Sequence, residues 1–318
     1  MSAILFPGQG VDWKTWMQPY LENNIVQNTL KEAENVTEIE IRKYIVEAEA
    51  KSNLRQPITT IAQPAILACS IALLRAFPPF TKKFRFYVGH SLGEYSAFVA
   101  SQTLSFSSAL KLVQARAKAM SYASALCQNP TSMLAITLTS RFPTDNFLNT
   151  VYSAVQKYRL IDIANVNSDR QIVLSGDKKE LESITSTLSE LVRSLGKLRS
   201  NWLDVSGAFH SRYMLPARDS LKNALGETEF NISPELCYTD SGKRFLPIIS
   251  NVTAELYPAD EEDIRRQLLL QCFRPVLFKN CLKTVKSKYG ANLFYAYGPG
   301  TTMQSIAKQN GISTKSRP

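Results

Sequence analysis

Hydrophobic residues along the chain fall into two patterns that follow each other in turn. Short apolar runs, typical of buried strands, alternate with longer segments in which apolar residues recur at helical spacing. The predicted strands cover residues 3–6, 84–88 and 246–252, and the predicted helices cover residues 25–50, 60–76, 94–100 and 107–126, the last with Ser107 as its expected N-cap. Strands that alternate with helices are typical of an α/β fold with a parallel sheet.

The middle of the chain shows a different order of elements. A strand, a helix, two strands and a helix follow one another at residues 133–138, 146–158, 161–165, 172–174 and 179–195. This order predicts a small α+β unit inserted into a larger domain. We therefore predict a discontinuous large α/β domain of residues 1–127 and 199–318, and a small subdomain of residues 128–198.

The composition is that of a globular protein with a sizeable core. The chain has 318 residues, of which 44% are hydrophobic and 20% charged. No uninterrupted apolar run approaches the length of a membrane span, and the N-terminus lacks the basic start and apolar core of a signal peptide. The five cysteines show no CxxC pair and no metal-binding spacing. These features predict a cytoplasmic protein with reduced thiols and no metal site.

The formal net charge is +10, from 37 Lys and Arg against 27 Asp and Glu. A positive net charge of this size can favour binding to nucleic acid, to an anionic membrane or to an acidic protein partner. The chain contains no nucleic-acid motif and no basic amphipathic anchor, so we expect neither nucleic acid nor membrane as a partner. Solubility is the plainest explanation of the charge, and an acidic protein partner remains open.

The most informative motif is the sequence Gly-His-Ser-Leu-Gly at residues 89–93. This G-x-S-x-G pattern lies between a predicted strand and a predicted helix, which is the context of a nucleophile elbow. A sharp turn there holds the serine in a strained conformation, and flanking glycines allow close backbone contacts. Ser91 is thereby predicted to expose its hydroxyl at a helix N-terminus, where backbone N–H groups stabilise an oxyanion.

A serine nucleophile needs a base, and the chain has only two histidines, His90 and His210. His90 is adjacent to Ser91, and neighbouring side chains on a tight turn point in different directions. His210 is therefore the predicted base, although a lone histidine is more often structural. Four aspartates between the serine and His210 are candidates for orienting the base, but none has a convincing position at a strand end: Asp162, Asp169, Asp177 and Asp204.

Several motifs, in order along most of the chain, resemble those of malonyl-CoA:acyl-carrier-protein transacylases, the acyltransferases of fatty acid and polyketide synthesis. An ordered set of motifs is far more specific than any one of them. They are Leu-Phe-Pro-Gly-Gln-Gly at 5–10, Gln-Pro-Ala at 63–65, the elbow at 89–93, Arg116 within 114–120, Asn-Ser at 167–168, Gly-Ala-Phe-His at 207–210, Ser-Asn-Val at 250–252, Gln271 and Gly-Pro-Gly at 298–300.

The resemblance implies a fold and a reaction. It implies an α/β-hydrolase-like large domain and a ferredoxin-like subdomain. The serine would take the malonyl group from malonyl-CoA and pass it, in ping-pong fashion, to the phosphopantetheine thiol of an acidic acyl carrier protein. No cofactor is expected to be bound permanently, and we expect a monomer. Steering of the carrier protein by the positive charge predicts a transfer rate that falls steeply with salt.

The resemblance also assigns roles to particular residues. It implies that the backbone amides of Gln9 and Leu92 form the oxyanion hole, and that the backbone carbonyl of Gln271 orients the base in place of an aspartate. Arg116 would bind the malonyl carboxylate, because a guanidinium can pair with a carboxylate through two parallel hydrogen bonds. The predicted contacts to the acyl group are Gln63, His90 and Phe209, the last crowding an α-methyl branch.

Three functions stay open on the sequence alone. The first is a malonyl transferase, for fatty acid synthesis or, from the resemblance of residues 207–214, for a polyketide synthase served in trans. The second is an acyl hydrolase that clears carrier proteins, which Arg116 disfavours. The third is a non-catalytic carrier-protein binding module, which the pairing of Ser91 with His210 disfavours.

Overall fold

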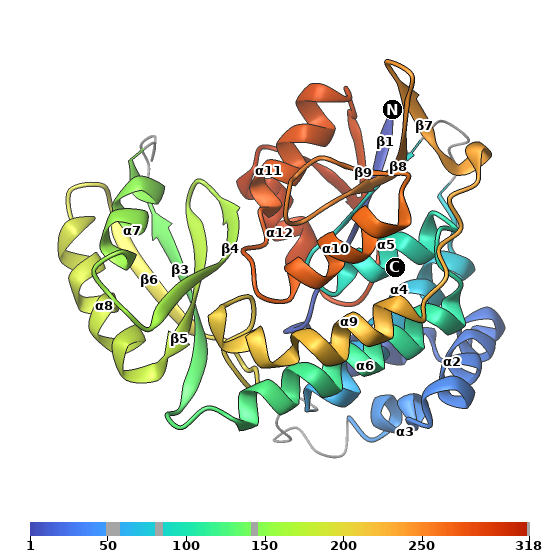
Figure 1. Ribbon diagram of the computed structural model, residues 1–318, viewed down its shortest axis with the longest axis horizontal. Helices are drawn as coiled ribbons and strands as arrows, with labels where there is room; N and C mark the ends of the chain where they lie inside the picture. The colour runs from blue at the N-terminus through green and yellow to red at the C-terminus, as the bar shows by residue number, and fades with distance from the viewer. Residues whose placement is uncertain (49–57, 80–84, 141–145, 317–318) are drawn as a thin grey trace.

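The computed structural model describes residues 1–48, 58–79, 85–140 and 146–316. It contains a large α/β domain and a smaller α+β subdomain beside it (Figure 1). The large domain is built on a seven-stranded sheet in the order β11-β10-β1-β2-β8-β7, with β9 also paired to β8. These strands are β1 Ser2–Phe6, β2 Arg85–Gly89, β7 Tyr238–Asp240, β8 Lys243–Ile249, β9 Leu256–Pro258, β10 Leu293–Ala296 and β11 Thr314–Ser316.

The central strands of this sheet are parallel and buried on both faces. β1 pairs in parallel with β2 and β10, β2 with β8, and β10 with β11, whereas β7 and β9 run antiparallel to β8. Ile4 and Phe6 enter one hydrophobic core while Ala3 and Leu5 enter another, as the period of two along a strand requires. All five residues of β1 are buried, which explains the apolar run of residues 3–6.

Helices cover both faces of the sheet. Residues of α4, α5 and α6 pack into the core on one face, and residues of α11 and α12 into the core on the other. The helices of this domain are α1 Trp13–Met17, α2 Asn24–Thr37, α3 Ile41–Val46, α4 Thr59–Ala76, α5 Gly93–Ala100, α6 Phe106–Ala125, α9 Arg218–Gly226, α10 Glu261–Gln271, α11 Phe278–Lys283 and α12 Thr302–Gln309. Short 3-10 helices lie at Gln18–Tyr20, Arg212–Ala217 and Pro234–Leu236, and a π-helical turn at Thr284–Lys288. By length and hydropathy α4 could cross a membrane, but 72% of it is buried inside the fold.

The small subdomain is a four-stranded antiparallel sheet with two helices. Its strands lie in the order β4-β5-β3-β6 and its elements follow the order β-α-β-β-α-β of a ferredoxin-like unit. They are β3 Thr131–Thr139, α7 Phe147–Val155, β4 Ile161–Ser168, β5 Gln171–Asp177, α8 Lys178–Leu191 and β6 Lys197–Trp202. The predicted domain boundary after residue 198 falls inside β6. The apolar pattern does not indicate this strand, because five of its six residues are exposed.

Two predicted helices differ from those in the structure. The helix predicted over residues 25–50 is broken into α2 and α3, because Glu38 adopts a left-handed conformation (φ 60°) that ends α2. Residues 49–50 of that prediction, and Phe84 of the predicted elbow strand, lie outside the described residues. The N-cap of α6 is Ser105 rather than the predicted Ser107, and its side chain accepts a hydrogen bond from the backbone N–H of Ser108 at 3.0 Å. The helix therefore begins at Phe106, one residue earlier than predicted.

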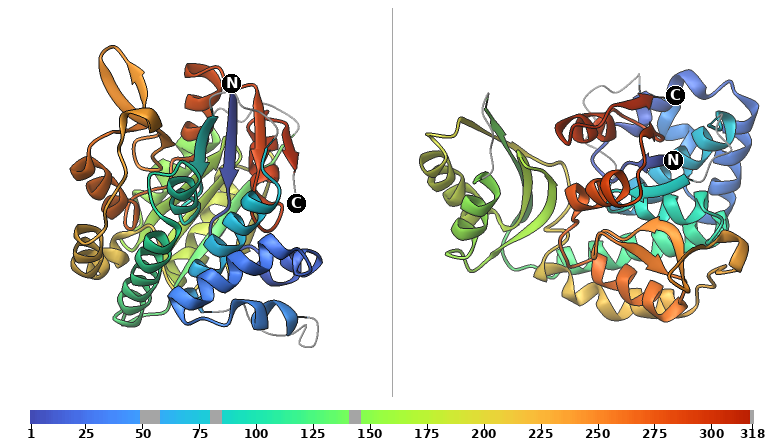
Figure 2. Two further views of the ribbon diagram at one scale, coloured as in Figure 1. Left: turned by 90° about the vertical axis from the view of Figure 1, so that its right-hand side faces the viewer. Right: turned by 90° about the horizontal axis from the view of Figure 1, so that it is seen from above.

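The topology brings three loops together at one edge of the large sheet. Phe6 is in register with Gly89, and Val88 is in register with Ile249, so β1, β2 and β8 end side by side. The loops after these parallel strands therefore meet where ligands bind in open α/β sheets. The small subdomain lies to one side of the large domain, as the view from above shows (Figure 2).

Candidate active site

The turn from β2 to α5 has the geometry of a nucleophile elbow. Ser91 sits in the left-handed region, with φ 52°. A Cβ on Gly89 would lie 1.9 Å from the carbonyl carbon of Gly93, and a Cβ on Gly93 would lie 2.3 Å from the carbonyl oxygen of Phe6. Only glycine fits at both positions. The side chain of Asn251 holds the turn from the third loop, accepting from Ser91 N and donating to Gly89 O, both at 2.7 Å.

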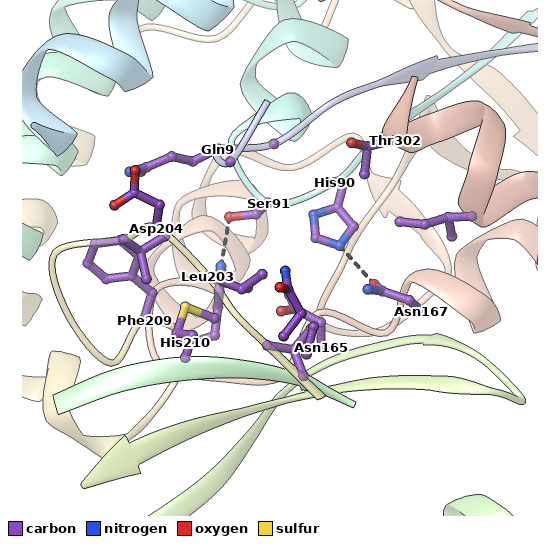
Figure 3. A pocket seen from close by; sticks show the side chains of 18 of the residues that line it. Gln9, His90, Ser91, Asn165, Asn167, Leu203, Asp204, Phe209, His210 and Thr302 are labelled. Atoms are coloured by element: carbon purple, nitrogen blue, oxygen red, sulfur yellow. Dashed lines mark hydrogen bonds between the residues drawn. The ribbon is translucent and has the colours of Figure 1, made fainter. Parts of the chain in front are cut away.

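The structure brings Ser91, His210 and Gln271 into one hydrogen-bonded chain. Ser91 Oγ lies 2.7 Å from His210 Nε2 (Figure 3). His210 Nδ1 lies 2.8 Å from the backbone carbonyl oxygen of Gln271. A carbonyl oxygen can only accept, so Nδ1 carries the proton and Nε2 presents its lone pair to the hydroxyl. The arrangement can remove the proton from the serine as it attacks an acyl group.

His210 is a neutral base in the resting protein. Burial and, to a smaller extent, the charge of Arg116 together lower its pKa from 6.5 to about 3, while the hydrogen bond to the Gln271 carbonyl opposes the shift. His210 itself has φ 58°, so both members of the Ser91–His210 pair sit in strained backbone conformations. Their loops are held in place by the surrounding contacts rather than by local preference.

The four candidate aspartates have other partners or positions. Asp162 forms an ion pair with Arg212, Asp169 with Lys279, and Asp177 caps the N-terminus of α8. Asp204 lines the cavity beside the serine. The carbonyl of Gln271 occupies the position next to His210 Nδ1 that an orienting carboxylate would take.

Arg116, on α6, is buried beside the nucleophile. Only 1% of its surface is exposed. One terminal nitrogen donates to Gln63 Oε1 at 2.7 Å, and the other to Gln271 Oε1 at 3.0 Å and to Ser91 Oγ at 3.3 Å. Its Nε–H has no hydrogen-bond partner in the described part of the chain. A buried guanidinium with a donor to spare, next to Ser91, can bind an anionic group of an acylating substrate.

Gln9 and Leu92 flank the serine from two loops. The loop after β1 packs tightly on the elbow, since a Cβ on Gly8 would lie 2.6 Å from the carbonyl oxygen of His90. The side chain of Gln9 donates to Thr59 Oγ1 at 3.1 Å and accepts from Gln63 at 3.4 Å, which anchors the loop. Leu92 lies at the N-terminus of α5, where the helix dipole favours negative charge. Backbone amides in these places can serve as oxyanion donors.

His90 points toward the small subdomain rather than toward the serine (Figure 3). Its Nε2 lies 2.9 Å from Asn167 Oδ1, and its ring packs edge-on against Phe278 with centroids 5.0 Å apart. Burial lowers the pKa of His90, so it is neutral near pH 7. His90 therefore lines the cavity and ties the elbow to β4.

The cavity around the serine has a volume of about 470 Å³ and walls from both domains. Ser91, His210, Arg116, Gln9, Gln63, His90 and Phe209 all line it. The opposite wall comes from the small sheet, through Met133, Ala135, Thr137, Asn165, Gln171 and Val173. These wall residues were not among the predicted site residues, although the alternation of residues 133, 135 and 137 along β3 is the signal of one sheet face. In the described residues, no three His, Cys, Asp or Glu side chains gather so as to hold a metal ion.

Comparison with known proteins agrees with this geometry. Residues 4–251 match the family model of the acyl transferase domain. The malonyl CoA-acyl carrier protein transacylase of Bacillus subtilis is 31% identical over 308 residues, which are 96% of this chain and 89% of that protein. The chain belongs to the malonyl CoA-acyl carrier protein transacylase family. The transacylase of Staphylococcus aureus is likewise 31% identical, over 97% of this chain and 92% of its own length.

Solved structures of transacylases share the whole fold. The acyl-carrier-protein S-malonyltransferase of Burkholderia pseudomallei superposes with a TM-score of 0.81 and 26% identity, covering 99% of this chain and 95% of the other. A malonyl-transacylase solved in complex with its type II PKS acyl-carrier protein superposes with a TM-score of 0.79 and 26% identity, over 99% and 95% of the two chains. Both the large α/β domain and the small antiparallel subdomain are therefore features of transacylase structures.

Proposed function

We propose that this protein transfers the malonyl group of malonyl-CoA to the phosphopantetheine thiol of an acyl carrier protein, through a malonyl ester on Ser91. The observation that carries the proposal is the buried guanidinium of Arg116, 3.3 Å from the hydroxyl that His210 contacts at 2.7 Å. A carboxylate-binding group beside an activated serine suits an acyl donor whose free end is anionic.

The reaction follows from the contacts. His210 Nε2 takes the Ser91 proton as Oγ attacks the thioester carbon. The amides of Gln9 and Leu92 hold the oxyanion. Collapse breaks the C–S bond, and His210 gives its proton to the departing CoA thiolate. In the second half-reaction His210 takes the proton of the carrier-protein thiol, the thiolate attacks the malonyl ester, and the proton returns to Ser91 Oγ. The carbonyl of Gln271 orients the imidazole throughout.

Arg116 favours the transferase over an acyl hydrolase. A hydrolase for simple acyl groups gains nothing from a buried cation, and burying an unpaired charge is costly. The guanidinium is held by the amides of Gln63 and Gln271, which leave it charged and oriented. Its charge is therefore available to the substrate. Malonyl-CoA supplies a carboxylate of the right sign at the free end of the acyl group.

Phe209 is proposed to favour malonyl over methylmalonyl groups. Phe209 lines the cavity next to His210 and is 4% exposed. An α-methyl branch would have to displace this ring. One methyl group in an apolar pocket is worth about 1–3 kcal/mol, so the preference is about 10- to 200-fold.

The carrier protein is proposed to approach along β6. Arg199 and Lys197 are exposed and pair across the strand with Thr137 and Thr139. Thr137 lines the cavity, and cross-strand partners point to the same face of a sheet. The two cations therefore extend the cavity wall outward, where they can attract an acidic carrier protein and the phosphate of its arm.

The pathway assignment is a finer part of the proposal. The resemblance of residues 207–214 to free-standing acyltransferases supports service to a polyketide synthase in trans, and one transacylase with the same fold was solved with a type II PKS carrier protein. Five free cysteines support a cytoplasmic location. We propose a monomer that needs no permanently bound cofactor, because malonyl-CoA and the carrier protein bring the reactive groups.

The test is intact mass spectrometry after mixing the protein with malonyl-CoA. The wild type should gain one malonyl group, and Ser91→Ala none. Ser96→Ala is the matched control, since Ser96 is a buried serine on α5, the helix that follows Ser91, and its hydroxyl has no partner among the described residues. It should gain the adduct as the wild type does. If no malonyl adduct forms and the protein rapidly hydrolyses acyl-carrier proteins, the protein is an acyl hydrolase and the transferase proposal is wrong.

A further inference from the structure

Glu94 is a buried carboxylate directly behind the nucleophile, and it takes no part in the proton transfers between Ser91, His210 and the two thiols. It lies on α5 and is 0% exposed. Its Oε1 accepts from the backbone N–H of Asn251 at 2.9 Å and from the hydroxyl of Tyr257 at 2.7 Å, and its Oε2 accepts from the side-chain amide of Gln271. All three donors are neutral groups. Burying a charge among neutral groups is costly, so the position calls for an explanation.

Gln271 joins Glu94 to both functional side chains of the site. Its side-chain oxygen accepts from Arg116 at 3.0 Å, and its backbone oxygen accepts from His210 at 2.8 Å. Its Nε2 donates to Glu94 and also to the backbone oxygen of Ser91, the latter at 2.8 Å. One residue therefore contacts the proposed nucleophile, base and carboxylate-binding arginine, and Glu94 holds its amide.

The donors and acceptors allow one orientation of this amide. A guanidinium can only donate and a carboxylate can only accept, so the Gln271 amide between Arg116 and Glu94 must turn its oxygen to the arginine. Asn251 also links Glu94 to the site, because its backbone N–H donates to Glu94 while its side-chain oxygen accepts from Ser91 N. Glu94 therefore accepts hydrogen bonds from both residues that hold the site, Gln271 and Asn251.

We propose that Glu94 is a positioning residue for the transfer reaction, which holds His210 and Arg116 through Gln271 and the Ser91 turn through Asn251. This proposal rests on the proposed function. Its charge has a second effect on the reaction. When His210 takes the serine proton, an imidazolium forms near the Arg116 guanidinium, and the carboxylate on the other side of Gln271 offsets this repulsion.

Glu94 is also set to titrate near neutral pH. Burial raises its pKa from 4.5 to about 7, against the hydrogen bonds from Tyr257, Asn251 and Gln271 and the charge of Arg116. Among the described residues, the titratable or charged groups that face it are Tyr95 on its own helix, Tyr257 on β9, Cys281 on α11 and Arg116 on α6. Burial raises the pKa of both phenols and of the thiol, so they stay neutral near pH 7. The guanidinium stays charged.

Glu94→Gln is the direct test, because it keeps the size of the side chain and removes the charge. A Gln amide has one oxygen, so either orientation turns its NH₂ toward a fixed donor, the Gln271 amide or the Asn251 backbone N–H. We expect single-turnover acylation by malonyl-CoA to slow at least about tenfold, since small displacements of reacting groups cost up to about 10²-fold.

Tyr257→Phe is the matched variant. It removes a hydrogen bond to the same carboxylate but leaves Gln271 and the Ser91 turn in place. It should keep the wild-type acylation rate at high pH. The lost hydrogen bond favoured the carboxylate form, so its loss raises the pKa of Glu94. The fall of the acylation rate at low pH, here called the acidic limb, should therefore occur about one pH unit higher than in the wild type.

The readout is the acylation rate between about pH 6 and 9, where the malonyl carboxylate stays ionised. In the wild type the rate should fall as pH falls through about 7. This limb should be absent from Glu94→Gln and displaced in Tyr257→Phe. A purely structural role for Glu94 would lower the rate equally at every pH. If Glu94→Gln fails to fold, the pH dependence of the acylation rate is compared between the wild type and Tyr257→Phe alone. An acidic limb at the same pH in both proteins would overturn the proposal.

The failure of this inference can be told from the failure of the proposed function. If the wild type gains no malonyl group on Ser91, the transferase assignment is wrong. If the wild type is acylated but Glu94→Gln keeps both its rate and its acidic limb, Glu94 has no positioning role, whatever the activity of the enzyme.

Discussion

Replacing Arg116 with alanine should remove the preference for malonyl-CoA without removing acyl transfer. Arg116 is the buried cation next to Ser91 Oγ, at 3.3 Å, and its Nε–H has no hydrogen-bond partner in the described structure. A malonyl carboxylate that loses this guanidinium is left buried and unpaired. Removing one partner of a buried, hydrogen-bonded charge pair costs about 2–5 kcal/mol, which corresponds to about 30- to 4000-fold in rate.

The substrate without a carboxylate is the internal control for this variant. Acetyl-CoA should acylate Arg116→Ala as fast as it acylates the wild type, or faster, because losing the guanidinium removes a charge that lowers the pKa of His210. The assay is the initial rate of adduct formation by intact mass, with both acyl-CoA esters, and the quantity of interest is the ratio of the two rates. We expect the malonyl-CoA rate divided by the acetyl-CoA rate to fall by about 10² to 10³.

Arg116→Lys separates charge from geometry. Lysine keeps the charge but cannot form two parallel hydrogen bonds to a carboxylate, so its ratio should lie between those of the wild type and the alanine variant. An equal fall of both acyl-CoA rates in Arg116→Ala would refute the carboxylate assignment. It would mean that the arginine supports the nucleophile or the fold, for example through its contacts with Gln63 and Gln271.

Three further outcomes are expected. Phe209→Ala should admit methylmalonyl-CoA and narrow its disadvantage against malonyl-CoA by about tenfold or more, and an unchanged ratio in acylation assays would place the discrimination elsewhere. Arg199→Glu should slow transfer to the carrier protein by about tenfold at low salt and converge with the wild type at high salt, whereas Lys31→Glu, on α2 at the far side of the molecule (Figure 1), should not. His210 has a folded pKa of about 3 against 6.5, so it contributes stability above pH 6.5 that is lost as pH falls toward 3. Thermal melting should therefore show the wild type losing more stability than His210→Asn between about pH 6.5 and 4, and parallel curves would contradict the buried neutral imidazole.

The local parts of the fold and site were predictable because their signals are local. The strand, the glycines and the helix of the elbow lie within residues 84–100, and the structure has all three apart from Phe84, which lies outside the described residues. Burial of β1 on both faces follows from its apolar run. The alternation of strands and helices correctly predicted an α/β domain with an inserted α+β unit, because each element has its own periodicity.

The parts that were not predicted depend on contacts between distant segments. Asn251 holds Ser91 across 160 residues, and Gln271 contacts Glu94 across 177. No periodicity in one sequence indicates such pairs. β6 was missed for a different reason. It is an edge strand that pairs with β3 alone in the described part of the chain, and its exposed polar residues lack the apolar alternation by which a half-buried strand is recognised.

The way the small subdomain joins the large domain has a consequence for how these proteins diversify. The chain enters the subdomain by β3 and leaves it by β6, and these two strands are neighbours in which Leu134 faces Trp202. Paired residues in an antiparallel ladder lie only about 5 Å apart, so the inserted segment begins and ends at almost the same point. Segments with adjacent ends are the ones that can be exchanged between homologues as units. Genetic recombination within each of these two strands would replace the outer cavity wall and the cationic residues of β6 together. The nucleophile elbow and its base would stay unchanged.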